Sequence, residues 1–160
     1  MPRDYIMRLV EQIAQMLASV IAKRRAGQHD EAKRELDAMC LEHIGLSLDF
    51  VRRASPEAVS EALANSGALR PVRSVALAEL LIQDAEMCDD AGRAAPAAFS
   101  RLHAFCLLAD NVDSLTRDEQ AIYRPKLDQL ARQLEVLRDN PFVGAKLRQY
   151  AERPVSRAES

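Results

Sequence analysis

The sequence predicts an all-α fold, and three observations lead to this fold class. Apolar residues recur at helical spacing along nearly the whole chain, residues that start or end helices stand between these segments, and no segment alternates as a half-buried strand does. At 160 residues, of which 48% are hydrophobic, the chain is long enough to bury a core. We expect six to eight helices in a single domain over residues 1–152, followed by a frayed tail at 153–160.

The first two predicted helices form a hairpin. A helix is expected over residues 3–25, because its apolar residues follow i, i+3, i+4, i+7 spacing. Gly27 suits the end of this helix, since Gly adopts positive φ without steric cost. A second helix is expected over about residues 29–43, with Gly45 at its end. So few residues join the two helices that they must run antiparallel.

The middle of the chain predicts two short helices and then a long one. Between residues 46 and 67, Ser55 is followed by Pro56 and Glu57, which together supply a capping residue, a Pro at the first helical position and an acid in the first turn. This helix start divides the segment in two. A longer helix with an apolar stripe is expected over about residues 72–91.

The remaining segments predict three more helices. Residues 95–113 are apolar most of the way round a helix, which indicates a central position in the fold. Thr116 and Glu119 have the spacing of a capping box and should open the next helix. Pro125 lies inside that helix and is expected to kink or split it. A last short helix is expected over residues 141–152.

A spacing from the first hairpin recurs later in the chain. Gly27 precedes Ala32 by five residues, and Gly92 precedes Ala97 by the same distance. In each case a small residue in the first turns of the second helix allows close packing on the first. This spacing is similar to the turn of tetratricopeptide-repeat (TPR)-like hairpins. We therefore expect TPR-like antiparallel hairpins packed as one right-handed, repeat-like bundle.

The opening residues 4–37 also carry a resemblance to a protein family. Its members begin with D-Y-I-M-R-x-I-E-Q and continue into a G-x-x-x-E-A turn. The matching residues here are Asp4, Tyr5, Ile6, Met7, Arg8, Glu11, Gln12, Gly27, Glu31 and Ala32. The chain resembles this uncharacterised family of bacterial, TPR-like helical proteins, although the later turn departs from the pattern at Ala95-Pro96. The resemblance implies a TPR-like fold and no catalytic residues.

Charge and composition limit the classes of partner. A net charge of −2 gives no general attraction to nucleic acid or to an anionic membrane. The most apolar run, residues 75–82, is too short to span a bilayer, and no signal peptide is evident at the N-terminus. We expect no nucleic-acid or membrane partner and a cytoplasmic location. The basic residues near two predicted helix ends are expected to be solvated: Lys23, Arg24, Arg25, Arg52 and Arg53.

The cysteines and histidines offer a possible chemical site. Cys40, Cys88 and Cys106 lie among apolar residues and are expected to be reduced and buried. Cys40 and His43, and likewise His103 and Cys106, are three residues apart on predicted helices, so two facing pairs could form a Cys2His2 zinc site. Structural zinc usually binds at loops or helix starts, whereas both pairs lie within helices. We therefore expect core cysteines, with a metal site or a Cys–His nucleophile as alternatives.

A cluster of acids ends the helix over residues 72–91. Asp84, Glu86, Asp89 and Asp90 could bind a metal or act as acid and base, but no His follows a Glu at the spacing of di-iron bundles. No P-loop, GxGxxG or HExxH motif is present either. We expect a solvated helix end, no cofactor and no enzymatic activity.

The expected function is therefore a non-enzymatic interaction or adaptor module that binds a helix or peptide on an apolar groove. The expected partner-binding residues lie on the first helix, away from the centre of its core stripe: Tyr5, Met7, Arg8, Ala14 and Ala18. Two alternatives remain open. One is a small-molecule-binding or metal-binding helical bundle, with or without catalytic activity, and the other is a structural homodimer formed through the first helix.

Overall fold

The computed structural model describes residues 3–153, and within this range it contains eight α-helices and no strand. The helices are α1 (Arg3–Arg25), α2 (His29–Met39), α3 (Leu48–Arg53), α4 (Pro56–Ala64), α5 (Arg70–Asp90), α6 (Ala94–Asn111), α7 (Arg117–Leu134) and α8 (Pro141–Ala151). A π-helical turn, η1 (Cys40–Ile44), extends α2, and short 3-10 turns lie at η2 (Gly67–Leu69), η3 (Val112–Ser114) and η4 (Glu135–Leu137). The predicted all-α fold and its number of helices are confirmed.

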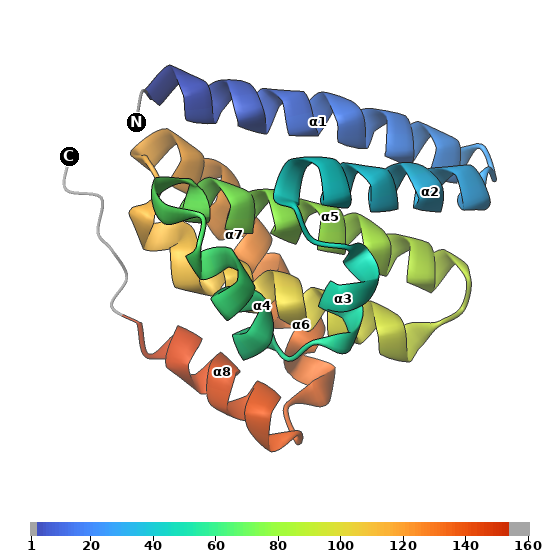
Figure 1. Cartoon of the computed structure of the whole chain (residues 1–160). Coiled ribbons are helices and arrows are strands. Elements are labelled where there is room, and N and C mark those ends of the chain that lie inside the picture. Colours follow the sequence, from blue (N-terminus) through green and yellow to red (C-terminus); the bar gives the residue numbers. More distant parts are fainter. Residues whose placement is uncertain (1–2, 154–160) are drawn as a thin grey trace.

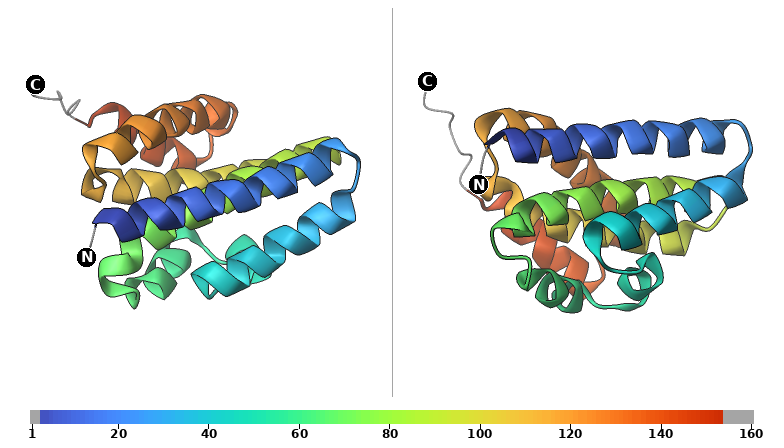
Figure 2. Two further views of the ribbon diagram at one scale, coloured as in Figure 1. Left: turned by 90° about the horizontal axis from the view of Figure 1, so that it is seen from above. Right: turned by 45° about the horizontal axis from the view of Figure 1, so that its top comes forward.

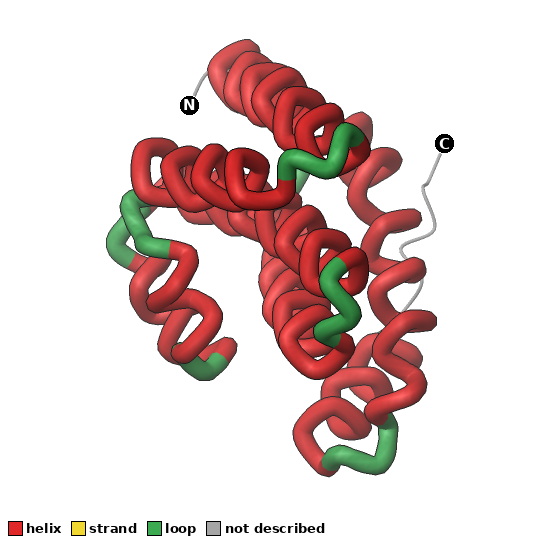
Figure 3. Tube along the Cα trace, turned by 90° about the vertical axis from the view of Figure 1, so that its right-hand side faces the viewer, coloured by secondary structure: helices red, strands yellow, loops and turns green. Residues whose placement is uncertain are grey.

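The antiparallel pair α5 and α6 forms the centre of the molecule (Figure 1). Helices α1 and α2 pack on α5, α7 packs on α6, and α4 contacts both members of the central pair. Seen from above, α2 and α7 lie on opposite sides of α1 (Figure 2). Helix α8 packs on α6 at the side of the molecule away from α1. Short loops join consecutive helices, which keeps most of the chain in hairpins (Figure 3).

Capping side chains fix where several helices begin. Ser47 and Ser55 accept hydrogen bonds from backbone N–H groups in the first turns of α3 and α4, each at 3.1 Å. At the start of α7, Thr116 and Glu119 form the predicted capping box. Asn140 caps α8 by accepting from two N–H groups of its first turn. These contacts are local in sequence, which explains why the helix starts could be predicted.

The two Gly turns have the same geometry. Gly27 and Gly92 have φ angles of 80° and 72°, in the left-handed region that favours glycine. The residue after each Gly donates its N–H to the carbonyl oxygen five residues earlier, at 2.9 Å after Gly27 and 2.8 Å after Gly92, as in a Schellman motif. Ala32 and Ala97 are both fully buried. The α1–α2 and α5–α6 hairpins are thus closed by equivalent turns 65 residues apart.

The hydrophobic core extends from α1 to α8, and α6 contributes its most continuous part. The seven consecutive residues 102–108 of α6 are all buried. The central position expected for this helix is confirmed. Within residues 3–153, none of the helices combines the length and hydropathy needed to cross a lipid bilayer.

Two details differ from the sequence prediction. The helix expected over residues 29–43 changes from α-helical to π-helical hydrogen bonding at Cys40 and ends at Gly45, whose φ is 84°. Of the kink or split expected at Pro125, the split is absent, because α7 is continuous from Arg117 to Leu134. Pro125 is exposed, so water can reach the backbone carbonyl that its missing N–H leaves unpaired.

Enlarging either buried turn alanine should destabilise the fold. Ala32→Leu and Ala97→Leu each place a larger side chain where two helices touch, and we expect each to lower the free energy of unfolding by about 1–3 kcal/mol. Ala14→Leu is the control, because Ala14 is exposed on α1. Urea denaturation followed by circular dichroism measures all three. Parental stability in both buried variants would contradict close packing at the turns.

Candidate functional site

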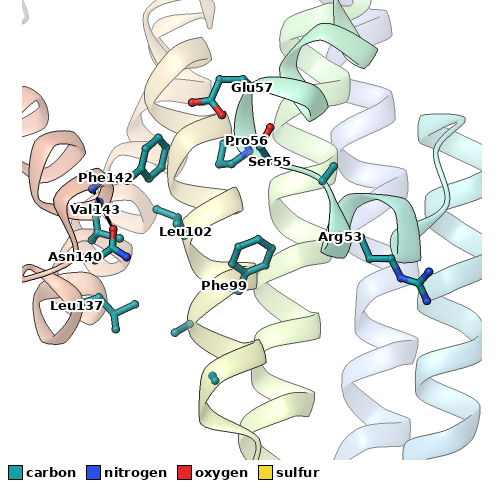
Figure 4. A pocket seen from close by; sticks show the side chains of 13 residues that line it. Arg53, Ser55, Pro56, Glu57, Phe99, Leu102, Leu137, Asn140, Phe142 and Val143 are labelled. Carbon is teal, nitrogen blue, oxygen red and sulfur yellow. Dashed lines mark hydrogen bonds between the residues drawn. The ribbon is translucent and has the colours of Figure 1, made fainter.

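An open apolar cleft, with a volume of about 600 Å³, lies between the α3–α4 connection, α6 and the start of α8 (Figure 4). We call it the aromatic cleft. Its apolar walls include Ala54, Pro56, Ala95, Phe99, Leu102 and Phe142. The side chain of Phe99 is 39% exposed, which is unusual for an aromatic ring on a central helix. No segment within residues 3–153 fills the cleft.

Helix starts position two walls of the aromatic cleft. Ser55 caps α4 and brings Pro56 to one side of the cleft, while Asn140 caps α8 and brings Phe142 to the other side. The third wall is a stripe of α6 that includes Phe99, and the three walls face one another across the hollow (Figure 4). Because the oxygen atoms of Ser55 and Asn140 already accept backbone hydrogen bonds, the cleft mainly offers apolar contact.

The amino-acid sequence alone did not reveal this cleft. Residues 95–113 were expected to form a central helix, and no face of that helix was expected to remain open. The useful signal was the excess of apolar residues around the helix over residues 95–113, because neighbouring helices cannot cover every face of a helix that is apolar all round. Which face remains open depends on the packing of α4 and α8, and periodicity alone does not reveal it.

The partner-binding residues expected on α1 are only partly brought together. Arg8, Ala14 and Ala18 are exposed, as expected for a free face. The side chains of Tyr5 and Met7 lie outside the described part of the structure. Ala14 lines a second hollow of about 500 Å³ between α1, α5 and α7, whereas Arg8 and Ala18 do not line it.

This second hollow, which we call the α1 groove, is also largely apolar. Val10 and Ile21 of α1 face Ile122 of α7, which is 45% exposed. A further hollow of about 430 Å³ continues between α5 and α7, and the two share the ion pair between Glu79 and Lys126. The α1 groove therefore offers a longer but more charged surface than the aromatic cleft.

The acidic cluster has a structural environment that the sequence analysis did not predict. Asp84 is buried, and its carboxylate accepts from Arg52 Nε at 3.3 Å, from Arg52 Nη2 and from Ser100 Oγ at 2.8 Å. Arg52 also lies 3.1 Å from Asp49 and 3.7 Å from Asp37. Nearby carboxylates raise the pKa of Arg52 in spite of the opposing effect of burial. Asp84 is thus the acceptor that joins α3, α5 and α6.

The other three acids of the cluster are also ion-paired. Glu86 and Asp90 lie 3.8 Å and 3.2 Å from Arg24 of α1, and Asp89 pairs with Arg101 of α6. The expectation of a solvated helix end was wrong for the buried Asp84, whereas Asp89 and Asp90 are exposed as expected. The carboxylates of the cluster neutralise arginine side chains of three neighbouring helices, α1, α3 and α6.

The corresponding expectation for the basic residues was wrong in part. Arg25 and Arg53 are exposed as expected. The side chains of Arg24 and Arg52 are only 15% and 24% exposed because they pair with the acids of α5, and Lys23 pairs with a glutamate of α2. These pairs join residues up to 66 positions apart, so no local pattern in the sequence could have revealed them.

The Cys–His pairs do not assemble into the four-ligand site that was considered. Among the residues that the structure describes, no three His, Cys, Asp or Glu side chains group as a metal ion would require. Cys40 and Cys106 are buried, and burial raises the pKa of each thiol to about 12. Cys88 is only half-buried, so the expectation of burial was wrong for this residue.

No family model, no curated protein and no solved structure matched this chain in the three comparisons.

Removing Arg52 should be more costly than removing an arginine of an exposed pair. Arg52→Met leaves the buried carboxylate of Asp84 with Ser100 as its remaining partner, and we expect a loss of about 3–5 kcal/mol. Arg101→Met is the matched control, with an expected loss of under about 1 kcal/mol, because its partner Asp89 is 42% exposed. Urea denaturation compares the two. Equal losses would contradict the special role of Asp84.

The thiols should differ in their reaction with an alkylating reagent. At pH 8 a thiol with a pKa of about 12 is ionised in about one molecule in ten thousand, so Cys40 and Cys106 should react slowly in the native protein. Cys88 should react first because it is half-buried. Mass spectrometry of timed iodoacetamide reactions gives the order. Labelling of Cys40 or Cys106 as fast as that of Cys88 would contradict the assigned burial.

Proposed function

We propose that this protein is a non-enzymatic interaction or adaptor module that holds an apolar helix or peptide segment of a partner in the aromatic cleft. The observation that carries the proposal is the partly exposed ring of Phe99 at the centre of an open cleft of about 600 Å³. Grooves of this kind bind the apolar face of an amphipathic helix, and buried aromatic residues commonly supply much of the binding energy.

The polar groups of the aromatic cleft support binding rather than catalysis. Ser55 and Asn140 act as helix caps, so their side chains are already engaged. The charged residues that line the cleft are Arg53 and Glu57, which are both exposed. They can pair with charges beside an apolar segment, whereas a catalytic site needs a nucleophile or base held by a neighbouring group.

A TPR-like architecture is part of the same proposal. The equivalent Gly turns of the α1–α2 and α5–α6 hairpins support it, as does the packing of both α1 and α2 on the first helix of the next hairpin. The resemblance of residues 4–37 to a family of TPR-like bacterial proteins is consistent with this architecture. The free cysteines suit a reducing compartment such as the cytoplasm.

The α1 groove is a second candidate for the same kind of function. Its support is the exposed Ile122 opposite Val10 and Ala14, and Ala14 is one of the partner-binding residues expected on α1. This surface could receive a partner helix or a second copy of the chain. The aromatic cleft remains the preferred site because its walls carry fewer charges.

Two matched variants distinguish these surfaces. Ala95 lines the aromatic cleft and Ala14 lines the α1 groove, and both are exposed on helices. Trp at either position fills the adjacent hollow, and we expect each variant to lose less than about 1 kcal/mol of stability. Helical peptides selected by display against the parent protein should bind at least tenfold more weakly to Ala95→Trp and unchanged to Ala14→Trp.

Fluorescence anisotropy of the selected peptides gives the affinities, and thermal melts confirm that both variants fold. The reverse pattern would assign binding to the α1 groove. Failure to select any peptide, or binding that neither variant weakens, would contradict the proposed function.

A further inference from the structure

A buried histidine lies behind one wall of the aromatic cleft. His103 of α6 is 1% exposed, and its ring packs edge-to-face on Phe99 with 4.7 Å between ring centroids. Neither imidazole nitrogen makes a hydrogen bond of ordinary geometry with a described residue, although the backbone of Ala54 lies close enough to favour the charged ring. Buried polar groups are normally paired, so an imidazole left unpaired at this position needs an explanation.

The surroundings of His103 suit the neutral imidazole and oppose the charged one. Burial lowers the pKa of His103, whereas the backbone of Ala54 and the carboxylate of Glu57 have a smaller effect in the opposite direction. Ala54 belongs to the α3–α4 connection and Glu57 to α4, and both line the cleft. Lys146 of α8 instead acts on Cys106, one turn further along α6.

The groups around the ring of His103 decide which contacts its protonation would disturb. An imidazolium has two N–H donors, and the backbone of Ala54 can serve at most one of them, so burying the charged ring is costly. Glu57, which lines the aromatic cleft, is the charged group that acts on His103. Movement of a charged ring toward Glu57 would disturb its packing on Phe99 and its position beside Ala54. Both changes alter the walls of the aromatic cleft.

We propose that His103 is an acid-sensitive latch of the aromatic cleft: while neutral, it packs beneath Phe99 and holds the α3–α4 connection on α6, and when protonated it releases both. The latch is a property of the fold and does not require that the cleft bind a peptide. If the proposed function holds, mild acid would also weaken peptide binding.

The direction of the pH effect follows from linkage. The pKa of His103 is lowered in the folded state, so the unfolded chain binds the proton more readily, near its ordinary value of about 6.5. The stability that neutral His103 provides is therefore complete above about pH 7.5. It falls as the pH drops below about 6.5, by at most about tenfold in the folding equilibrium constant per pH unit for one proton.

A tryptophan reporter can test the latch in the full chain. The chain contains no Trp, so Phe142→Trp places a single fluorophore in the cleft wall opposite α6. Between pH 7.5 and 5.0 we expect its emission to change and the urea midpoint to fall. When His103→Gln or His103→Phe is added to the reporter, the change in emission and the fall in the urea midpoint over this pH range should both become smaller. His29→Gln is the matched control, because His29 is exposed and should leave them intact.

Two further measurements make the outcome decisive. The imidazole signals of His103 in the NMR spectrum of the native parent should titrate below pH 6.5, and Glu57→Gln should lower that midpoint by removing a favourable charge. A native titration at or above pH 6.5 would overturn the proposal. So would an acid response of the cleft that persists unchanged in both His103 variants, or a cleft fluorescence that stays constant over this pH range in the reporter protein.

Discussion

The buried carboxylate of Asp84 is the constraint on which the position of the α3–α4 connection depends. A carboxylate removed from water needs compensating charge and hydrogen bonds, and Asp84 obtains them from Arg52 of α3 and Ser100 of α6. Helix α3 has six residues, too few to be stable alone, and it buries only Leu48 and Val51. The ion pair therefore fixes a helix whose own apolar contacts are few.

This constraint extends to the aromatic cleft. Ala54 follows Arg52 by two residues and forms part of the cleft wall. With Arg52 held on α5, the chain continues along a path that places Ala54 and Pro56 in the cleft wall that faces Phe99. The cleft is thus a consequence of how a charged contact on α5 and two capped helix starts place their neighbours, leaving part of α6 uncovered.

The sequence predicted the features that depend on neighbouring residues. The Gly turns, the caps at Ser55 and Thr116 and the apolar stripe of each long helix are encoded within a few positions, and the structure confirms them. The ion pairs of Asp84 and Arg24 depend on residues 32 and 66 positions away, so the same reasoning wrongly predicted solvated charges. The aromatic cleft was missed for a related reason, because exposure of Phe99 depends on where α4 and α8 come to lie.

Two contacts of different kinds therefore hold the α3–α4 connection, one at Arg52 and one at Ala54. At Arg52 the contact is electrostatic and directed at α5, whereas Ala54 lies beside the buried imidazole of His103 on α6. Protonation of His103 would affect the contact at Ala54 and would leave the ion pair between Arg52 and Asp84 in place. Because Arg52 would still hold α3 on α5, we infer that movement of the connection would begin after α3, at the segment that carries Ala54, Pro56 and Glu57. Mild acid would then change the aromatic cleft without unfolding the central pair of helices.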